Sequence, residues 1–286
     1  MVLTHNLKGL GGYTSAAINK LGIKHIHTLH DIQLLHPSGL LVHGQENKLN
    51  TVLSKIYFKI NRFYFRNVKI VISPSKWLIK EHLKYNFFVN SRKLILPNPV
   101  LVKKFSDHKN FKANFPVIKL LYIGHINNAK GALFLIDALK KLTLKYRLGL
   151  AGQIYSPTVK KKIALNKNID FLGYLNRDEI EKIIRESDLL IVPSLCYENS
   201  PTVIYEAASM GLPVLASRIG GITETVHFLG GILFNPGNSQ DLVFKLNWAI
   251  KNPRVLHKIG ESAQLKAKEY SLDFYIEKLL AAIKKN

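Results

Sequence analysis

Cysteine is almost absent from the sequence, and long apolar runs are missing altogether. The single cysteine, Cys196, has no partner for an internal disulfide, which fits a reducing compartment, and we interpret it as packing at a strand end rather than as a nucleophile. No stretch approaches the roughly 18 consecutive apolar residues of a membrane-spanning helix, and the first residues lack the pattern of a signal peptide. These absences predict a cytoplasmic protein that does not span a membrane.

Acidic residues are scarce as well. The 286 residues include 19 Asp and Glu against 41 Lys and Arg, which gives a formal net charge of +22 with neutral histidines. This charge favours an anionic partner, namely a nucleic acid, an anionic membrane surface or a phosphorylated substrate, although nucleotide bias explains lysine-rich usage equally well. No nucleic-acid-binding motif accompanies the charge, so we do not expect nucleic acid as the partner.

One basic segment has a helical period. Lys55, Lys59, Arg62 and Arg66 recur on one face of a helix, and aromatic residues fill the other faces. Such a helix can lie on anionic lipid headgroups with its aromatic residues at the interface, which would make the protein peripheral at the inner membrane face. The alternative is an ordinary core helix with a solvated basic face.

Short apolar segments alternate with amphipathic helical segments along the chain. Strands this apolar are buried on both faces, so the sequence predicts an α/β fold with doubly wound parallel sheets. The expected strands are 24–29, 68–72, 93–96, 117–123, 147–151, 169–172, 189–192, 213–216 and 231–234. The expected helices are 13–21, 51–66, 76–84, 132–144, 177–185, 202–210 and 242–251.

A boundary between two domains is predicted where Pro97 and Pro99 interrupt regular structure. The expected domains are 1–100 and 117–270, with a linker at 101–116 and a C-terminal helix at 271–286 that packs back on the N-terminal domain. Residues 1–5 already have the pattern of a strand end, so the N-terminal domain is expected to be incomplete. A missing sheet edge would expose unpaired strands and favour self-association or a partner chain.

Polar residues and glycines gather at strand ends, where ligands of open α/β sheets bind. Gly124 lets the backbone turn after a strand, and Lys130 at the next helix start can place its ammonium group on a phosphate. Ser200 as N-cap and Pro201 as first helical residue would leave the amides of residues 201–203 open at a helix N-terminus, which is an anion site.

Two acids flank that helix start, Glu198 before it and Glu206 inside it. Carboxylates accept hydrogen bonds from sugar hydroxyls, so we infer a ligand with both phosphates and hydroxyls. If only one of the two acids were present, the favoured interpretation would be a capped surface helix with an acid of no functional role. The glycine pair 220–221 allows close backbone approach before another helix. Tyr174 and Leu175 follow a further strand and can form a wall for a base.

Taken together, these motifs resemble the family 4 glycosyltransferases of the GT-B fold, also named glycosyl transferases group 1. The resemblance covers nearly the whole chain and rests on Glu198-x7-Glu206, the segment 210–214, and Gly124 with Lys130 and Gly131. It implies two Rossmann-like domains facing across a cleft, the N-terminal one incomplete. It also implies a retaining, metal-independent hexosyltransferase that needs no cofactor, and the sequence contains no Asp-x-Asp motif.

The resemblance further implies roles for individual residues. Lys130 would bind the donor diphosphate, Glu198 the donor sugar and Glu206 the ribose, and His30 would lie near the transferred sugar. The implied catalytic residues are therefore Glu198, Lys130 and His30. The implied donor-binding residues are Gly124, His125, Lys130, Tyr174, Leu175, Glu198, Asn199, Ser200, Pro201, Thr202 and Glu206. The implied acceptor cleft contains His5, Asn6, His30 and Asp31.

Three neighbouring histidines invite a metal interpretation. In a strand, His25 and His27 share one face and His30 takes the other, so a compact triad is not expected. A structural or cleft-lining role is favoured, and no metal site is predicted.

Two departures from the family pattern bear on activity. His125 stands where the family usually has an arginine, which predicts weaker donor binding. The N-terminal domain also lacks the family's opening strands and glycine-rich turn. The favoured function is sugar transfer from a nucleotide-diphosphate sugar to a glycan, lipid-linked or small-molecule acceptor in glycan, glycolipid or polysaccharide synthesis. The alternatives are a non-catalytic sugar-nucleotide-binding subunit that needs a partner chain, or another GT-B activity such as an epimerase.

Overall fold

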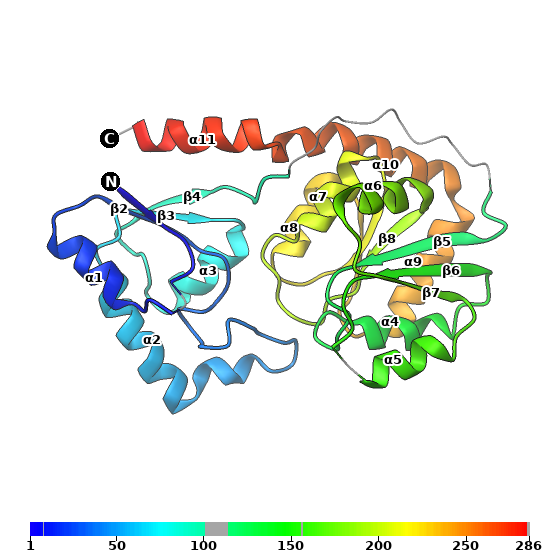
Figure 1. Cartoon of the computed structure of the whole chain (residues 1–286), viewed down its shortest axis with the longest axis horizontal. Helices are drawn as coiled ribbons and strands as arrows, with labels where there is room; N and C mark the ends of the chain where they lie inside the picture. The colour runs from blue at the N-terminus through cyan, green and yellow to red at the C-terminus, as the bar shows by residue number, and fades with distance from the viewer. Residues whose placement is uncertain (8, 101–113, 156, 285–286) are drawn as a thin grey trace. The chain divides into compact units, whose positions relative to one another are not determined.

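The computed structural model describes residues 1–7, 9–100, 114–155 and 157–284, and the chain divides into two compact units (Figure 1). Unit 1 comprises Met1–Asn98, Cys196–Ser200 and Tyr275–Asn286, and unit 2 comprises Pro99–Leu195 and Pro201–Phe274. Most of the predicted linker, residues 101–113, lies outside the described residues.

Unit 1 is built on a four-stranded parallel sheet in the order β1-β2-β3-β4. Its strands are β1 (Val2–Thr4), β2 (His25–Thr28), β3 (Ile70–Ser73) and β4 (Arg92–Ile95). Its helical segments are α1 (Tyr13–Lys20), η1 (Glu46–Asn50), α2 (Val52–Phe65), α3 (Lys76–Lys84) and most of α11 (Leu272–Lys284).

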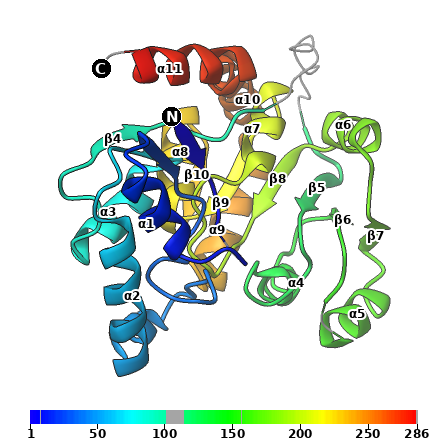
Figure 2. The same cartoon turned by 60° about the vertical axis from the view of Figure 1, so that its left-hand side comes forward.

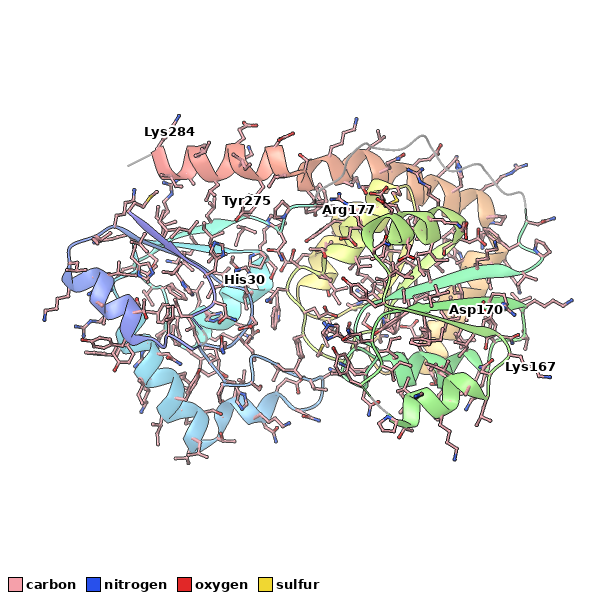
Figure 3. The ribbon with its side chains drawn as sticks, in the orientation of Figure 1. His30, Lys167, Asp170, Arg177, Tyr275 and Lys284 are labelled. Carbon is pink, nitrogen blue, oxygen red and sulfur yellow. The ribbon has the colours of Figure 1, made fainter. Side chains whose placement is uncertain are left out.

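Both faces of the unit 1 sheet are covered, because successive side chains of a strand point to opposite faces. Val71 of β3 belongs to the apolar cluster that includes Phe58 of α2 and Leu78 of α3. Its neighbour Ile72 belongs to a second cluster, against which Tyr275 and other residues of α11 pack. Figure 3 shows Tyr275 on the side of α11 turned toward this sheet.

Unit 2 is built on a six-stranded parallel sheet in the order β10-β9-β8-β5-β6-β7. Its strands are β5 (Ile118–Ile123), β6 (Tyr146–Ala151), β7 (Ile169–Gly173), β8 (Leu189–Val192), β9 (Val214–Ser217) and β10 (Ile232–Phe234). Its helical segments are α4 (Ala132–Leu139), α5 (Pro157–Ala164), α6 (Arg177–Glu186), α7 (Thr202–Ser209), α8 (Gly220–Leu229), α9 (Ser239–Lys251), α10 (Pro253–Ala267) and η2 (Lys268–Tyr270).

Helices also cover both faces of the unit 2 sheet. Leu120 and Tyr122 of β5 share one apolar cluster with residues of α4, α5 and α9, whereas the intervening Leu121 is buried on the opposite face. Helices α6, α7 and α8 contact the strands on that opposite face (Figure 1). The prediction of doubly wound parallel sheets is therefore confirmed for both units.

Several helix bounds differ from the predicted ones. Helix α4 ends at Leu139 rather than at residue 144, because Leu142 closes a tight turn onto the Leu139 carbonyl (3.1 Å) and is buried in the core. Helix α8 begins at Gly220, so the glycine pair lies inside its first turn and not before it. Helices α5 and α10 had no predicted counterpart, although Asn252-Pro253 is a recognisable helix start.

None of the helices in the described part of the chain is long and apolar enough to cross a membrane.

Candidate functional site

A pocket of about 380 Å³ lies in unit 2, where β7 ends and α6 and α7 begin. Its lining residues are Pro99, Val100, Tyr174, Leu175, Arg177, Ile180, Glu181, Thr202, Glu206, Ser209 and Met210. Pockets of this size, mainly apolar with a few polar groups, bind small molecules and cofactors. Four predicted donor-binding residues, Tyr174, Leu175, Thr202 and Glu206, therefore line one pocket.

Two carboxylates line this pocket, Glu206 and Glu181, and Glu181 forms an ion pair with Arg177 (3.7 Å). Glu206 is the one that coincides with a predicted donor-binding residue. It lies half-buried on α7, and burial raises its pKa above the ordinary value, an effect that the positive charge of Arg177 opposes. A partly desolvated carboxylate gains more from a hydrogen-bond donor than a solvated one does, because it has lost water partners. The pocket thus offers Glu206 to a ligand hydroxyl.

The start of α7 differs from its prediction. The N-cap is Pro201, with no side-chain cap, and the helix begins at Thr202. The Ser200 hydroxyl instead accepts from the Asn98 amide (3.4 Å), so the predicted Ser200 cap is wrong. Pro201 has no N–H to offer, and the Ile204 amide is already used, because it donates to the Pro201 carbonyl (3.1 Å). The predicted anion site is therefore reduced to the amides of Thr202 and Val203.

A second candidate loop of unit 2 joins β5 to α4. Gly124 has φ 142°, and the Lys130 amide donates to the Asn127 side chain (2.8 Å) inside the loop. Gly131 is the N-cap of α4 at φ 75°, and a Cβ there would lie 1.8 Å from the Pro193 carbonyl oxygen. His125 is exposed, with its ring centroid 5.2 Å from that of Tyr155.

The backbone of this loop is packed against a neighbouring strand end. A Cβ on Gly152, which follows β6, would lie 1.9 Å from the Gly124 carbonyl oxygen. The sequence prediction did not include Gly152, although a glycine directly after an apolar strand is the available signal. Gly124 and Gly152 thus let two strand ends approach each other, and this contact shapes the candidate phosphate loop.

The segment Cys196–Ser200, which carries Glu198, belongs to unit 1. Cys196 is buried and pairs with Val42 in an antiparallel bridge, which accords with packing rather than nucleophilic chemistry. The Tyr197 ring stacks on Trp77 (5.3 Å between centroids), and its hydroxyl donates to Glu46 (2.8 Å).

Two further features tie this segment to unit 1. Burial, followed by the hydrogen bond to Glu46, raises the pKa of Tyr197 to about 12, so the phenol stays a neutral donor. The Asn199 amide group donates to the His30 carbonyl. Glu198 and Glu206, a close pair in sequence, are therefore carried by different units.

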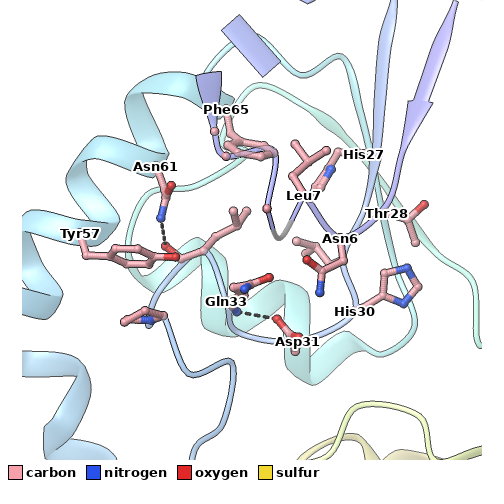
Figure 4. Close-up of a pocket in the computed structure, with 16 residues that line it drawn as sticks. Asn6, Leu7, His27, Thr28, His30, Asp31, Gln33, Tyr57, Asn61 and Phe65 are labelled. Carbon is pink, nitrogen blue, oxygen red and sulfur yellow. Dashed lines mark hydrogen bonds between the residues drawn. The ribbon is translucent and has the colours of Figure 1, made fainter. Parts of the chain in front are cut away.

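A pocket of about 290 Å³ lies in unit 1, and the predicted acceptor residues Asn6, His30 and Asp31 line it (Figure 4). His5 is hydrogen-bonded to His30 (Nδ1 to Nε2, 2.9 Å). Burial, with a smaller contribution from His5, lowers the pKa of His30, and Asp31 opposes this shift. His30 thus favours the neutral form, which can both donate and accept hydrogen bonds.

One buried polar atom of this pocket lacks a hydrogen-bond partner among the described residues. The Thr28 hydroxyl is buried and makes no hydrogen bond within the described residues. Buried polar groups are normally satisfied, so this oxygen is available to a ligand hydroxyl or water.

Other lining residues were missed by the sequence prediction. Tyr57 and Asn61 line the same pocket from α2, on the side away from His30 in Figure 4. Gly9, Gly11 and Gly12 also line it, in the turn before α1, so the prediction that the N-terminal domain lacks a glycine-rich turn is wrong. These glycines are visible as a cluster in the sequence, whereas the two α2 residues carry no motif.

The neighbouring histidines form a buried structural cluster. His25 and His27 both share a hydrogen bond with the Thr4 hydroxyl (2.7 and 2.8 Å), while His30 lies beyond the strand end. Burial lowers the pKa of His25, and it lowers that of His27 well below 6.5. Among the described residues, no group of three or more His, Cys, Asp or Glu side chains is arranged to hold a metal ion.

Comparison with known proteins relates this geometry to a family. Glycosyl transferases group 1 matches residues 103–266, more than half of the chain. An uncharacterized glycosyltransferase of Methanocaldococcus jannaschii is 29% identical over 269 residues, which cover 93% of this chain and 69% of the relative. An uncharacterized 42.6 kDa protein in the cps region of Klebsiella pneumoniae is 27% identical over 236 residues, covering 82% of this chain and 61% of the relative.

A solved structure extends the comparison to the fold. Anabaena HepE in complex with UDP is 20% identical, with a TM-score of 0.81 over 99% of this chain and 79% of that one. Its agreement with both parallel α/β units shows that the fold is GT-B. From the match over residues 103–266 it follows that the chain belongs to the glycosyl transferases group 1 family.

Proposed function

We propose that this chain is a family 4 hexosyltransferase, retaining and metal-independent, that moves a sugar from a nucleotide-diphosphate sugar to a hydroxyl acceptor. The observation that carries the proposal is the unit 2 pocket, in which the half-buried Glu206 lies one turn from the Thr202 amide at the start of α7. A carboxylate for hydroxyls and a helix N-terminus for phosphate are the two groups that a nucleoside diphosphate requires.

The donor would be held by three parts of unit 2. Tyr174 and Leu175 form a wall for the base, and Glu206 accepts from the ribose. The amides of Thr202 and Val203, with the loop that carries Lys130, bind the diphosphate. The complex of Anabaena HepE with UDP supports a uridine nucleotide as the first donor to examine.

The rate enhancement in this proposal comes from stabilising the leaving group. As the bond between the sugar and the diphosphate breaks, negative charge grows on the diphosphate oxygen. The Lys130 ammonium group and the preorganised helix amides interact more strongly with that charge than with the ground state. Lys130 thereby supplies the positive charge that a metal ion supplies in other transferases, and this supports the metal-independent proposal.

The acceptor would bind in the unit 1 pocket. Asn6, Asp31 and the buried Thr28 hydroxyl, which has no partner among the described residues, offer hydrogen bonds to acceptor hydroxyls. Neutral His30 lies beside them. Glu198 precedes Asn199, whose side chain donates a hydrogen bond to the His30 carbonyl. We assign Glu198 to the donor sugar, and the resemblance of the Glu198-x7-Glu206 motif to the family 4 pattern supports the retaining stereochemistry.

The wider setting of the reaction is also a proposal. Glycan, glycolipid or polysaccharide synthesis is supported by the relative from the Klebsiella cps region. A cytoplasmic location at a membrane surface is supported by the lone buried cysteine and by the net charge of +22.

Purified protein and a panel of UDP-, GDP- and ADP-sugars test this function by hydrolysis and transfer. Glu206→Gln is expected to raise the donor KM about 10- to 100-fold, because a charge-assisted hydrogen bond contributes about 1.5–3 kcal/mol. Glu198→Gln is expected to lower kcat about 100-fold or more, because its bond strengthens as the sugar departs. Glu186→Gln, an exposed acid at the end of α6, is the matched control.

The outcomes are distinct. Turnover that both site variants lower and the control leaves intact supports a working transferase. Donor binding without turnover in the unaltered protein would instead identify a non-catalytic sugar-nucleotide-binding subunit. Interconversion of donor sugars without transfer would identify an epimerase.

His125→Arg is expected to tighten donor binding about three- to tenfold. An arginine stays charged at neutral pH and can form paired hydrogen bonds with a phosphate, which an imidazole cannot do. Because His125 is exposed, the longer side chain has room. Isothermal titration with the donor nucleotide measures the effect, and His125→Gln serves as the uncharged comparison. Unchanged or weaker binding of His125→Arg would remove residue 125 from the donor site.

A further inference from the structure

Helix α2 carries two different exposed stripes. Its inner face is buried through Ser54, Phe58 and Phe65. A second face carries five large apolar side chains that are 51% to 80% exposed, namely Val52, Leu53, Ile56, Ile60 and Phe63. We call this the apolar stripe. A third face carries Lys55, Lys59, Arg62 and Arg66, which we call the basic stripe.

The apolar stripe is not explained by the core of unit 1. A surface helix usually turns charged or polar residues to solvent, whereas this one turns a continuous apolar row outward beside the basic stripe. Single exposed apolar residues are common, but a contiguous row marks an interaction surface. Figure 2 shows α2 extending along the outside of unit 1, and the exposed fractions of its side chains show that the apolar stripe is not covered within that unit.

The charged side chains from Asn47 to Lys80 are all positive, and the nearest acids in sequence are Glu46 in η1 and Glu81 in α3. The sequence contains no Asp or Glu from Asn47 to Lys80, so no acid of this segment neutralises the basic stripe. The Arg66 guanidinium lies 4.2 Å from the centre of the Phe63 ring, a cation–π contact that joins the two stripes at their C-terminal ends. The exposed Lys48 adds a further positive charge just before α2.

We propose that α2 binds the surface of an anionic lipid bilayer. The helix lies parallel to the membrane plane, with the apolar stripe inserted at the boundary between headgroups and acyl chains and the basic stripe on the lipid phosphates. A second copy of the chain fits less well, because pairing the stripes of two copies would bring like charges together. Nucleic acid would use the basic stripe but leave the apolar stripe in water.

This surface has a consequence for the acceptor that rests on the proposed function. Tyr57 and Asn61 lie on the same helix, between the apolar stripe and the buried face, and line the unit 1 pocket. A membrane-bound α2 therefore brings that pocket to the bilayer surface, which favours a lipid-linked acceptor. Membrane binding itself is measured without donor or acceptor, so it can fail or succeed independently of transferase activity.

Vesicle co-sedimentation of the full chain tests the proposal. We expect at least about tenfold tighter binding to vesicles of phosphatidylcholine mixed with phosphatidylglycerol than to phosphatidylcholine alone, because each basic residue near an anionic surface adds attraction. Ile56→Ser with Ile60→Ser is expected to weaken binding about tenfold or more. Lys55→Gln with Lys59→Gln is expected to remove most of the preference for anionic vesicles and most of the salt dependence.

Matched control variants in unit 2 test whether vesicle binding depends on α2 or on exposed apolar and basic residues in general. Leu165→Ser with Leu265→Ser removes two apolar residues that are 76% and 61% exposed, and Lys160→Gln with Lys161→Gln removes two exposed charges of α5. Both pairs are expected to bind vesicles as the unaltered protein does.

Three results would overturn the proposal. The first is equal vesicle binding by the stripe and control variants. The second is a lipid-free dimer in analytical ultracentrifugation that only the apolar-stripe variant dissociates, which would assign the surface to a second copy. The third is binding of an oligonucleotide, lost in the basic-stripe variant, without any binding to anionic vesicles.

Discussion

Gly131→Ala is expected to lower the free energy of unfolding of unit 2 by about 3 kcal/mol or more and to abolish donor binding. Gly131 adopts φ 75°, where a side chain costs about 1–2 kcal/mol. The added Cβ would also lie 1.8 Å from the Pro193 carbonyl oxygen, a backbone atom at the end of β8 that cannot rotate away. To remove this steric clash, the loop that carries Lys130 would have to move away from the end of β8.

Gly230→Ala separates the cost of the backbone conformation from the cost of the steric contact. Gly230 has φ 81° at the end of α8, and a Cβ there would meet only the Lys266 ammonium nitrogen at 3.9 Å. This control should therefore cost about 1 kcal/mol, the conformational part alone. Urea unfolding of both variants in a Trp77→Phe background, in which Trp248 of unit 2 is the one remaining tryptophan, reports on unit 2. If Gly131→Ala and Gly230→Ala lowered the free energy of unfolding equally, the steric contact with Pro193 would contribute nothing to the loss.

Unit 1 is expected to lose stability as the pH falls from about 6.5 toward 4. His82 is fully buried, its Nδ1 donates to the Leu78 carbonyl (2.9 Å), and its Nε2 has no partner within the described residues. Burial lowers the pKa of His82 to about 4 and lowers those of His25 and His27. Between these values and the ordinary 6.5, the unfolded state binds more protons, so stability decreases as the pH decreases.

The expected magnitude for His82 follows from its shift. A change from 6.5 to about 4 corresponds to about 3 kcal/mol, lost progressively down to pH 4. Urea titrations at a series of pH values in a Trp248→Phe background follow unit 1 through Trp77, which packs on its core. His82→Gln removes one titrating group and should flatten the pH dependence, whatever its effect on absolute stability. A slope identical to that of the unaltered protein would mean that the pKa of His82 is the same in the folded and unfolded states.

The framework of both units could be predicted from local sequence pattern. Strand β8 (Leu189–Val192) and helix α3 (Lys76–Lys84) have the predicted bounds, and the other predicted strands differ by one or two residues at their ends. Continuous apolar runs and helical periods are local signals, and the rule that ligands bind beyond strand ends pointed to the loops of Gly124 and Glu206. Those parts needed no knowledge of which segments pack together.

Other features of the fold and of the candidate site could not be predicted, because they depend on contacts between segments that are distant in sequence. A turn motif does not reveal that Gly131 meets Pro193, or that Ser200 accepts from Asn98 rather than capping α7. The helical period of α2 separated its basic residues onto one face. Only packing against the unit 1 core decided that Phe58 is buried and Ile60 is exposed, because both are apolar and burial depends on what lies opposite each face. The sequence thus determined the elements and the chemistry of their ends, and the tertiary structure decided which side chains are buried and which surfaces stay exposed.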